Sequence, residues 1–351
     1  MTTLNAYQQF EGRHPETGTL CNALAYQGRP LSEALLLGVS GGAAFMVFLF
    51  DYEGYTPHIA LGTRYPFDAF DAAVERLRLN AARFETTSPA KAAAQLEAAL
   101  AAGKPAIVWA DRRSLPYSAL PADEFPYVQP LLVYGYDEAA GVVQIADRAR
   151  APLTCTPAEL AAARARQGSL KHRLITLNPP DHYDLIPALE SGLRACAGLF
   201  LDKPPKGPAA NFGLAGLQKW ARLLTDPKDK AGWRVKLPAG EALYNALIHV
   251  FEAVVILSGD GGAARWDYAD FLDEASALLD RPELQAIAAQ FRASAALWRD
   301  LADAALPEST PALRQTRDLL TEREQRYLTE GSASVERRQQ ITAELSRLAQ
   351  A

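Results

Sequence analysis

Near the start of the chain, apolar residues recur three or four positions apart and then give way to longer apolar runs. The segment 15–27, PETGTLCNALAYQ, has this helical spacing and stops at Gly28, so it predicts a helix. Pro15 suits the first turn of that helix, because the N–H that proline lacks would have no intrahelical partner there. A second short helix is predicted at 32–38, followed by a glycine-rich loop at 38–42.

Continuous apolar runs bounded by turn residues predict strands further along the first half of the chain. These predicted strands lie at 43–52, 105–111, 130–137 and 142–147. Helices are predicted between and after them, at 66–82, 89–102 and 156–168. The pattern indicates an α+β fold for the first half, in which the N-terminal helix packs against the sheet formed by the later strands.

From about residue 185 onward, almost every segment has helical spacing. We therefore predict two domains, an α+β domain at 1–180 and an all-α domain at 185–351, with a boundary at the NPPDHYD stretch, 178–184. In the polar tail, 312–351, three apolar residues (Ile341, Leu345 and Leu348) share one helix face. This pattern predicts a surface helix that packs on its own domain, and a homodimer contact is the alternative.

Composition narrows the class of protein. Hydrophobic residues make up 49% of the 351 residues, which excludes a disordered chain. The net charge is −5 and the basic residues are scattered, so we expect neither nucleic acid nor a membrane as the partner. The N-terminus lacks a basic and then apolar signal segment, and the apolar run 43–50 is too short to span a bilayer, so the predicted location is cytoplasmic.

Cysteine and histidine spacing gives no sign of a metal site. The three cysteines, Cys21, Cys155 and Cys196, are far apart and form no CxxC pair, which predicts reduced thiols. The five histidines have no zinc-ligand spacing either. No metal and no cofactor is expected.

Two single residues invite a catalytic interpretation. Ser40 lies in GVSGG, which matches G-x-S-x-G, but a nucleophile elbow needs a strand before the serine and a helix after it, and the predicted order is reversed. Cys21 lies six residues into its helix, whereas a thiolate activated by a helix needs the first turn. Both are predicted to be structural, and His14 before the helix is predicted to cap it or face solvent.

Several stretches together resemble the butirosin-biosynthesis acyltransferase family. In the first half they are GRHPETGTLCNALAYQGRPLSEALLLGVSGGAAF, LGTRYP, AALAAGKPAIVWADRRSLPY, VQPLLVYGYDEAAGVVQIAD and ELAAARA. In the second half, NFGLAGLQKWA, SGDGGAARWDYADFLDEA and FRASAALW resemble the helical domain that follows in many members. The resemblance implies an N-terminal domain of the papain-like cysteine-peptidase type, with a helix packed on an antiparallel sheet, followed by an all-α domain.

The resemblance also implies a chemistry. A cysteine at a helix N-terminus takes an acyl group from a carrier-protein thioester and passes it to an amine, while a histidine moves the proton and an aspartate orients the histidine ring. In this sequence the cysteine position is Pro15 and the histidine position is Gln129, and only the aspartate remains, as Asp147. Proline has no nucleophilic atom, and an amide takes up no proton near neutral pH.

The first hypothesis is therefore a pseudoenzyme that keeps the fold without the reaction. It would bind a peptide, an acyl-carrier arm or a small metabolite in a natural-product or modified-peptide pathway. The expected cleft residues are Arg13, His14, Glu16, Ser40, Gln129 and Asp147.

The alternative hypothesis is an active, amide-forming acyltransferase with relocated chemistry. An acyl-carrier protein would supply the acyl group and a small-molecule amine would accept it. His14 would then be the base, with Asp147 or Glu16 as its partner, or Cys21 would be the nucleophile.

Overall fold

A computed structural model describes residues 2–51, 57–120, 127–202 and 204–350. The chain forms two compact units, each built from separate stretches of sequence. Unit 1 contains residues 1–36, 77–183 and 322–343, and unit 2 contains 37–76, 184–321 and 344–351. The predicted boundary near residue 180 coincides with one of the places where the chain passes between the units, but the chain passes between them at four other places as well.

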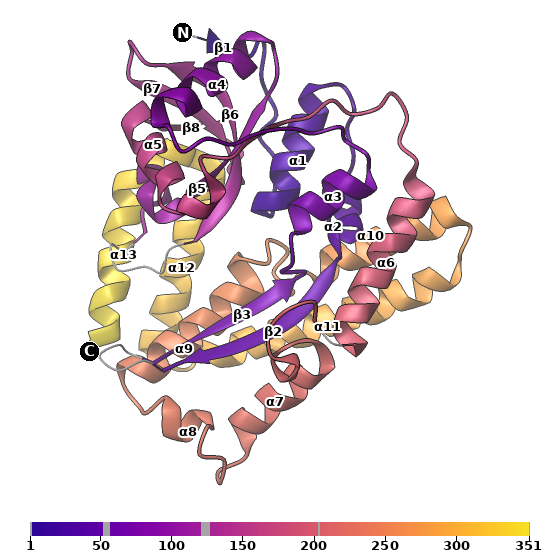
Figure 1. The fold of residues 1–351 in the computed structure, drawn as a ribbon. Helices are drawn as coiled ribbons and strands as arrows, with labels where there is room; N and C mark the ends of the chain where they lie inside the picture. The colour runs from indigo at the N-terminus through magenta and orange to yellow at the C-terminus, as the bar shows by residue number, and fades with distance from the viewer. Residues whose placement is uncertain (1, 52–56, 121–126, 203, 351) are drawn as a thin grey trace. The chain divides into compact units, whose positions relative to one another are not determined.

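Unit 1 is built around an antiparallel sheet of seven strands (Figure 1). The strand order is β4-β9-β5-β6-β7-β8, and β1 pairs with β6. The strands are β1 Thr2–Thr3, β4 Ala82–Phe84, β5 Ala106–Asp111, β6 Val128–Asp137, β7 Val142–Ala146, β8 Leu153–Cys155 and β9 Leu174–Thr176. The predicted strands at 105–111, 130–137 and 142–147 are confirmed as β5, β6 and β7. The four short strands carry too few residues to show a pattern.

Helix α1, Pro15–Tyr26, packs against the central strand β6, as predicted. Aromatic rings form part of this contact. Tyr7 stacks on Tyr134 of β6 with ring centroids 4.4 Å apart and also contacts Tyr26 of α1. The mixed helix-and-sheet class predicted from the apolar pattern is therefore confirmed for this unit.

Two further helices, α4 Pro89–Ala101 and α5 Pro157–Ala165, contact strands of this sheet. Their starts follow from local sequence, because Ser88 accepts a hydrogen bond from the backbone of Lys91 and Thr156 forms a capping box with Glu159. Both helices also begin with proline at the first turn.

Unit 2 combines a two-stranded hairpin with helices. Strand β2, Ala43–Phe50, pairs antiparallel with β3, His58–Arg64. The end of the predicted strand at residue 52 lies outside the described residues. From residue 185 to the C-terminus the described elements are all helical, but unit 2 itself contains this hairpin. Its longer helices are α3 Ala69–Arg76, α6 Leu185–Leu201, α7 Gly213–Thr225, α9 Glu241–Phe251, α10 Arg265–Leu279, α11 Glu283–Ala305 and the first part of α12 Pro311–Glu330.

A buried arginine explains why the hairpin belongs with the helices. Arg265, at the start of α10, donates hydrogen bonds to the carbonyl oxygens of Thr63 and Ala44 at 3.0 and 2.7 Å. Its guanidinium also lies 5.1 Å from the ring centroid of Trp298, which in turn contacts Phe45 of β2. Separating the hairpin from α10 would leave the buried charge of Arg265 and two buried carbonyl oxygens unpaired, so these contacts favour this one arrangement.

The glycine-rich loop predicted at 38–42 is partly wrong. Helix α2 spans Glu33–Ser40 and therefore includes Gly38. The ring of Phe271 fills the space beside Gly38, where an added Cβ would lie 2.1 Å from ring atoms. Gly38 therefore lies within a helix and not in a loop, and the absence of a side chain there allows the close packing of Phe271.

Candidate functional site

The candidate site lies in unit 1, where α1 begins near the start of β6 and the end of β7. Pro15 is the first residue of α1 and is buried. One turn later, the hydroxyl of Thr19 donates to the carbonyl oxygen of Pro130, on β6, at 3.4 Å. The chain before α1 runs close to the end of β7, because a Cβ added at Gly12 would lie 3.7 Å from the Cα of Arg148. The first turn of α1 is thus held near Asp147, which follows β7.

Gln129 and Asp147 form a direct pair at this end of the sheet. Gln129 lies on β6, and its Nε2 donates to Asp147 Oδ2 at 3.1 Å. Both side chains are buried. The amide of Gln129 thus lies directly beside the Asp147 carboxyl. Adjacent antiparallel strands bring the two together across 18 positions of sequence.

Burial raises the pKa of the Asp147 carboxyl above its ordinary value, and the nearby Arg148 opposes this shift. The side chain is only 5% exposed. Its Oδ1 has no hydrogen-bond partner within the described residues, and the same holds for the buried hydroxyl of Tyr117. A buried carboxylate oxygen without a donor is unfavourable, which acts in the same direction as burial.

A tyrosine from far along the chain also contacts Asp147. The hydroxyl of Tyr327, in α12, donates to Asp147 Oδ2 at 3.0 Å. Arg148 lies 5.2 Å from the Tyr327 ring centroid and donates to Glu324 at 2.8 Å. No local pattern in the sequence connects α12 with a strand end 180 positions earlier, so these residues could not be assigned to the site from the sequence.

Glu33 is a second residue that the sequence analysis did not assign to the site. Its carboxylate accepts from the backbone N–H groups of Arg13 and His14, at 2.8 to 3.0 Å, and from the Thr17 hydroxyl at 2.8 Å. These donors surround the start of α1, where backbone N–H groups lack intrahelical partners and a negative charge is favourable. Glu33 therefore stabilises the helix end that carries Pro15.

His14 is completely buried rather than exposed, which corrects one part of its predicted role. It occupies the N-cap position of α1, but its side chain makes no capping hydrogen bond. Its Nδ1 lies 3.3 Å from Thr17 Oγ1 and 3.6 Å from Glu33 Oε1. The imidazole thus contacts the same groups that organise the start of the helix.

Cys21 lies on α1 in an environment that suppresses its reactivity. Burial, followed by the nearby Glu33 and Glu11, raises the pKa of the thiol to about 12. The Sγ atom faces the carbonyl oxygen of Leu31 at 3.6 Å. A neutral thiol is a poor nucleophile, which supports the structural role predicted for Cys21.

The remaining expected cleft residues are placed differently from one another. Arg13 is exposed and Glu16 is partly buried, and both flank the start of α1 in unit 1. Ser40 belongs to unit 2, where its buried hydroxyl donates to the Leu37 carbonyl within α2 at 2.7 Å. That bond occupies the hydroxyl proton in an ordinary helical contact.

Comparison with known families supports the resemblance seen in the sequence. Residues 14–148 match the family described as butirosin biosynthesis protein H, N-terminal. Residues 14–148 of this chain are thus similar to the butirosin biosynthesis protein H family. Residues 158–330 match a domain of unknown function, DUF4872, so the two family matches follow each other along most of the chain. The search of curated proteins finds no match.

The family match includes Pro15, Gln129 and Asp147, the positions at which the resemblance implies the cysteine, the histidine and the aspartate, since all three lie within 14–148. The DUF4872 match extends to residue 330 and therefore includes Tyr327. Among the residues that the structure describes, no three His, Cys, Asp or Glu side chains are grouped as metal ligands. Within the same residues, no helix combines the length and apolar character needed to cross a membrane.

Proposed function

We propose that this chain is a catalytically degenerate member of its family that binds an acyl-carrier arm, a peptide or a small metabolite in a butirosin-type or related biosynthetic pathway. One observation supports this proposal above the others. Pro15 begins α1 and the Gln129 amide donates to Asp147, so the positions to which the family resemblance assigns the cysteine and the histidine hold a proline and a glutamine.

The chemistry of these side chains argues against acyl transfer. Proline cannot attack a thioester, and the Gln129 amide donates to Asp147 instead of accepting a proton. A nucleophile and its base act as one unit, so a remaining aspartate contributes little by itself.

The relocated mechanisms have no support from the geometry. A general base must reach the proton that it removes, and His14 is fully buried against Thr17. With a thiol pKa of about 12, only roughly one Cys21 in 10⁴ is a thiolate at pH 8. Binding without turnover is therefore the proposed role.

The decisive experiment restores the missing groups. The wild-type protein is incubated with an acyl N-acetylcysteamine thioester and an amine, beside the Pro15→Cys/Gln129→His double variant. We expect no turnover above background for the wild type, and covalent acylation at position 15 in the double variant, detected by mass spectrometry. Each single variant is a matched control, and neither should turn over because the pair acts as a unit.

Wild-type turnover that is abolished by His14→Ala or by Cys21→Ala would overturn the proposal. A folded double variant that remains inert would contradict the papain-like placement of positions 15 and 129. Binding is tested separately by NMR titration with pantetheine, with shifts expected at Gln129 and Asp147 and none at Ser40. Absence of any shift up to millimolar pantetheine would exclude an acyl-carrier arm as the ligand.

A further inference from the structure

The C-terminal part of unit 1 is a helical hairpin, residues 322–343, made from the end of α12 and the start of α13, Val335–Gln350. We propose that this hairpin is a positioning element of the candidate site, in which Tyr327 fixes the orientation of the Asp147 carboxyl. The proposal deepens the proposed function, because Asp147 belongs to the same site. Its test uses neither a ligand nor an acyl donor.

The hairpin docks along the segment that begins with Asp147. The Tyr327 hydroxyl donates to Asp147 Oδ2 at 3.0 Å. Further along, the Arg150 N–H donates to the Leu328 carbonyl at 2.7 Å, and the Thr154 N–H donates to Ser332 Oγ at 2.9 Å. Contacts at residues 147, 150 and 154 follow the same order as residues 327, 328 and 332, so the hairpin is held in one register.

Arg338 fastens the hairpin to a second part of unit 1. It is only 1% exposed, and its guanidinium donates to the carbonyl oxygens of Tyr117 at 2.6 Å, Ser118 at 3.3 Å and Gly331 at 3.1 Å. Its Nε donates to Ser334 Oγ at 2.9 Å. These contacts favour a single position of the hairpin, because the loss of any of them would leave the buried charge of Arg338 less well compensated.

The ring of Tyr327 contacts two charged groups. The guanidinium carbons of Arg148 and Arg338 lie 5.2 and 5.3 Å from its centroid. Cation–π contacts at such distances are favourable, and more so where water is excluded. The hydroxyl therefore has a fixed direction toward Asp147.

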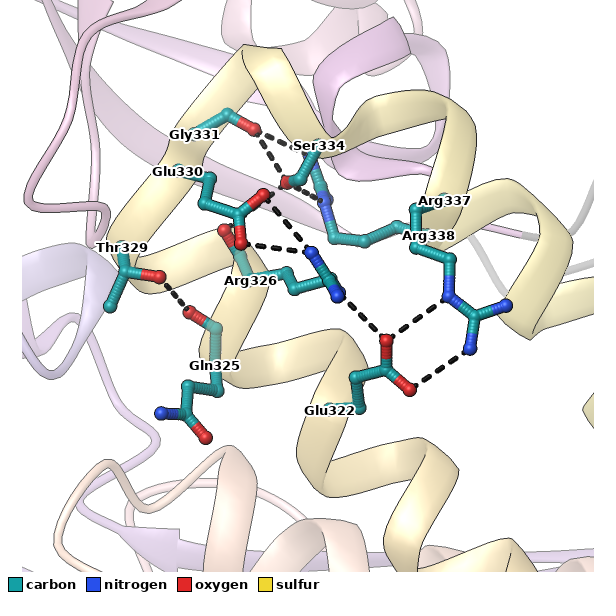
Figure 2. Close-up of polar contacts among 9 residues, drawn as sticks. All are labelled: Glu322, Gln325, Arg326, Thr329, Glu330, Gly331, Ser334, Arg337 and Arg338. Atoms are coloured by element: carbon teal, nitrogen blue, oxygen red, sulfur yellow. Dashed lines mark hydrogen bonds and ion pairs between the residues drawn. The ribbon is translucent and has the colours of Figure 1, made fainter.

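Ion pairs stabilise the hairpin internally. Figure 2 shows Glu322 between Arg326 and Arg337, which it contacts at 2.7 and 3.0 Å, so that it joins α12 to α13. Arg326 also pairs with Glu330 at 3.0 Å. The Ser334 hydroxyl can donate to the carbonyl oxygen of Gly331 at 3.0 Å or to that of Arg326 at 3.1 Å. These contacts hold the turn that presents Tyr327 and Arg338 to the rest of the unit.

The arrangement has a consequence for the site. Gln129 and Tyr327 both donate to Oδ2 of Asp147, which leaves Oδ1 as the oxygen with no donor among the residues described. A ligand group that reaches this carboxyl must therefore offer a hydrogen-bond donor to Oδ1 if Asp147 is ionised. Tyr327 of the hairpin and Gln129 of β6 together determine which oxygen this is.

The proposal is tested with the full chain carrying Tyr327→Phe. The Tyr327 hydrogen bond lowers the pKa of Asp147, so its loss should raise that pKa further, measured by carboxyl ¹³C NMR. Hydrogen exchange across 322–343 should become about tenfold faster, as expected for the loss of one buried hydrogen bond. A hairpin that merely covers the sheet would change exchange without changing the Asp147 pKa.

Tyr244→Phe is the matched control, since the Tyr244 hydroxyl lies 2.6 Å from Thr316 Oγ1 on the same helix α12 but within unit 2. It should leave the Asp147 pKa unchanged. If Tyr327→Phe does not fold, 3-fluorotyrosine at position 327 keeps the ring, strengthens the donor and should lower the Asp147 pKa. The proposal would be overturned if the Asp147 pKa stayed the same in both Tyr327→Phe and the 3-fluorotyrosine variant. It would also be overturned if Tyr244→Phe shifted that pKa by the same amount.

Discussion

At position 15, where the resemblance implies a cysteine, the proline of this chain suits the backbone. Proline at the first turn of α1 forfeits no intrahelical hydrogen bond, and its restricted φ matches the helix. At position 129, glutamine keeps a donor toward Asp147 although it cannot serve as a base. Both substitutions therefore preserve local structure, and neither by itself predicts a less stable protein.

Asp147→Asn is expected to be at least as stable as the wild type at pH 7. Burial raises the folded-state pKa of Asp147 above its unfolded value of about 3.9. The stability that the carboxyl contributes is thus fully present below about pH 3.9 and is lost as the pH rises through the raised folded-state pKa. Asparagine keeps an acceptor for Gln129 and Tyr327 without a charge. Urea unfolding from pH 3 to 7 should show the advantage of the variant shrinking as the pH falls.

The control for this series is Asp300→Asn, at an exposed position on α11, which should not reproduce the pH-dependent difference. An Asp147→Asn variant that is less stable than the wild type at pH 7, by a deficit that shrinks as the pH falls, would show instead that the folded state requires the ionised carboxylate.

At the scale of elements, α1 is held from outside as well as by its own sequence. The side chain of its N-cap residue His14 makes no capping hydrogen bond, and the His14 backbone N–H donates to Glu33 at the start of α2. By contrast, α4 and α5 carry their own caps at Ser88 and Thr156. Of these three helices, the one that bears the candidate site therefore depends on another element at its start.

Glu33→Ala should destabilise the protein by about 1–3 kcal/mol, because it removes a charged acceptor from two backbone N–H groups and the Thr17 hydroxyl. The free energy of unfolding in urea measures the loss. Faster hydrogen exchange is expected at the first turn of α1.

Glu33→Gln is the matched variant for that measurement. It keeps an acceptor oxygen without the charge, so its loss should be smaller than that of Glu33→Ala. Equal stability of Glu33→Ala and the wild type would mean that water replaces the carboxylate at no cost.

At the scale of the whole molecule, the order of the chain and the composition of the units differ. Residues 37–76 contribute to the helical unit, and residues 322–343 contribute to the unit that contains the sheet. The family matches at 14–148 and 158–330 likewise do not coincide with the units. Each unit thus needs sequence from both halves of the chain.

A fragment of residues 1–183 is therefore expected not to fold cooperatively. It would leave Asp147 without Tyr327 and the 117–118 carbonyls without Arg338, and its hairpin would lack Arg265. Thermal unfolding followed by near-ultraviolet circular dichroism should show a transition for the full chain and none for the fragment. A sharp transition in the fragment would show that these contacts are dispensable for the sheet.

The sequence by itself determined the features that depend on neighbouring residues. Proline at the start of α1, the caps of α4 and α5, and the apolar runs of β5, β6 and β7 are local signals, and the structure confirms the elements that they predict. The resemblance placed Gln129 and Asp147 on neighbouring strands, and they form a hydrogen bond.

Only the tertiary structure decided which distant segments complete each unit. Periodicity indicates that a face will be buried but not what buries it. Glu33, Tyr327 and Arg338 therefore could not be assigned to the site from sequence, because their partners lie about 20 to 220 positions away. Polar groups buried on folding must find partners wherever the fold brings them, and this requirement places the C-terminal hairpin beside Asp147.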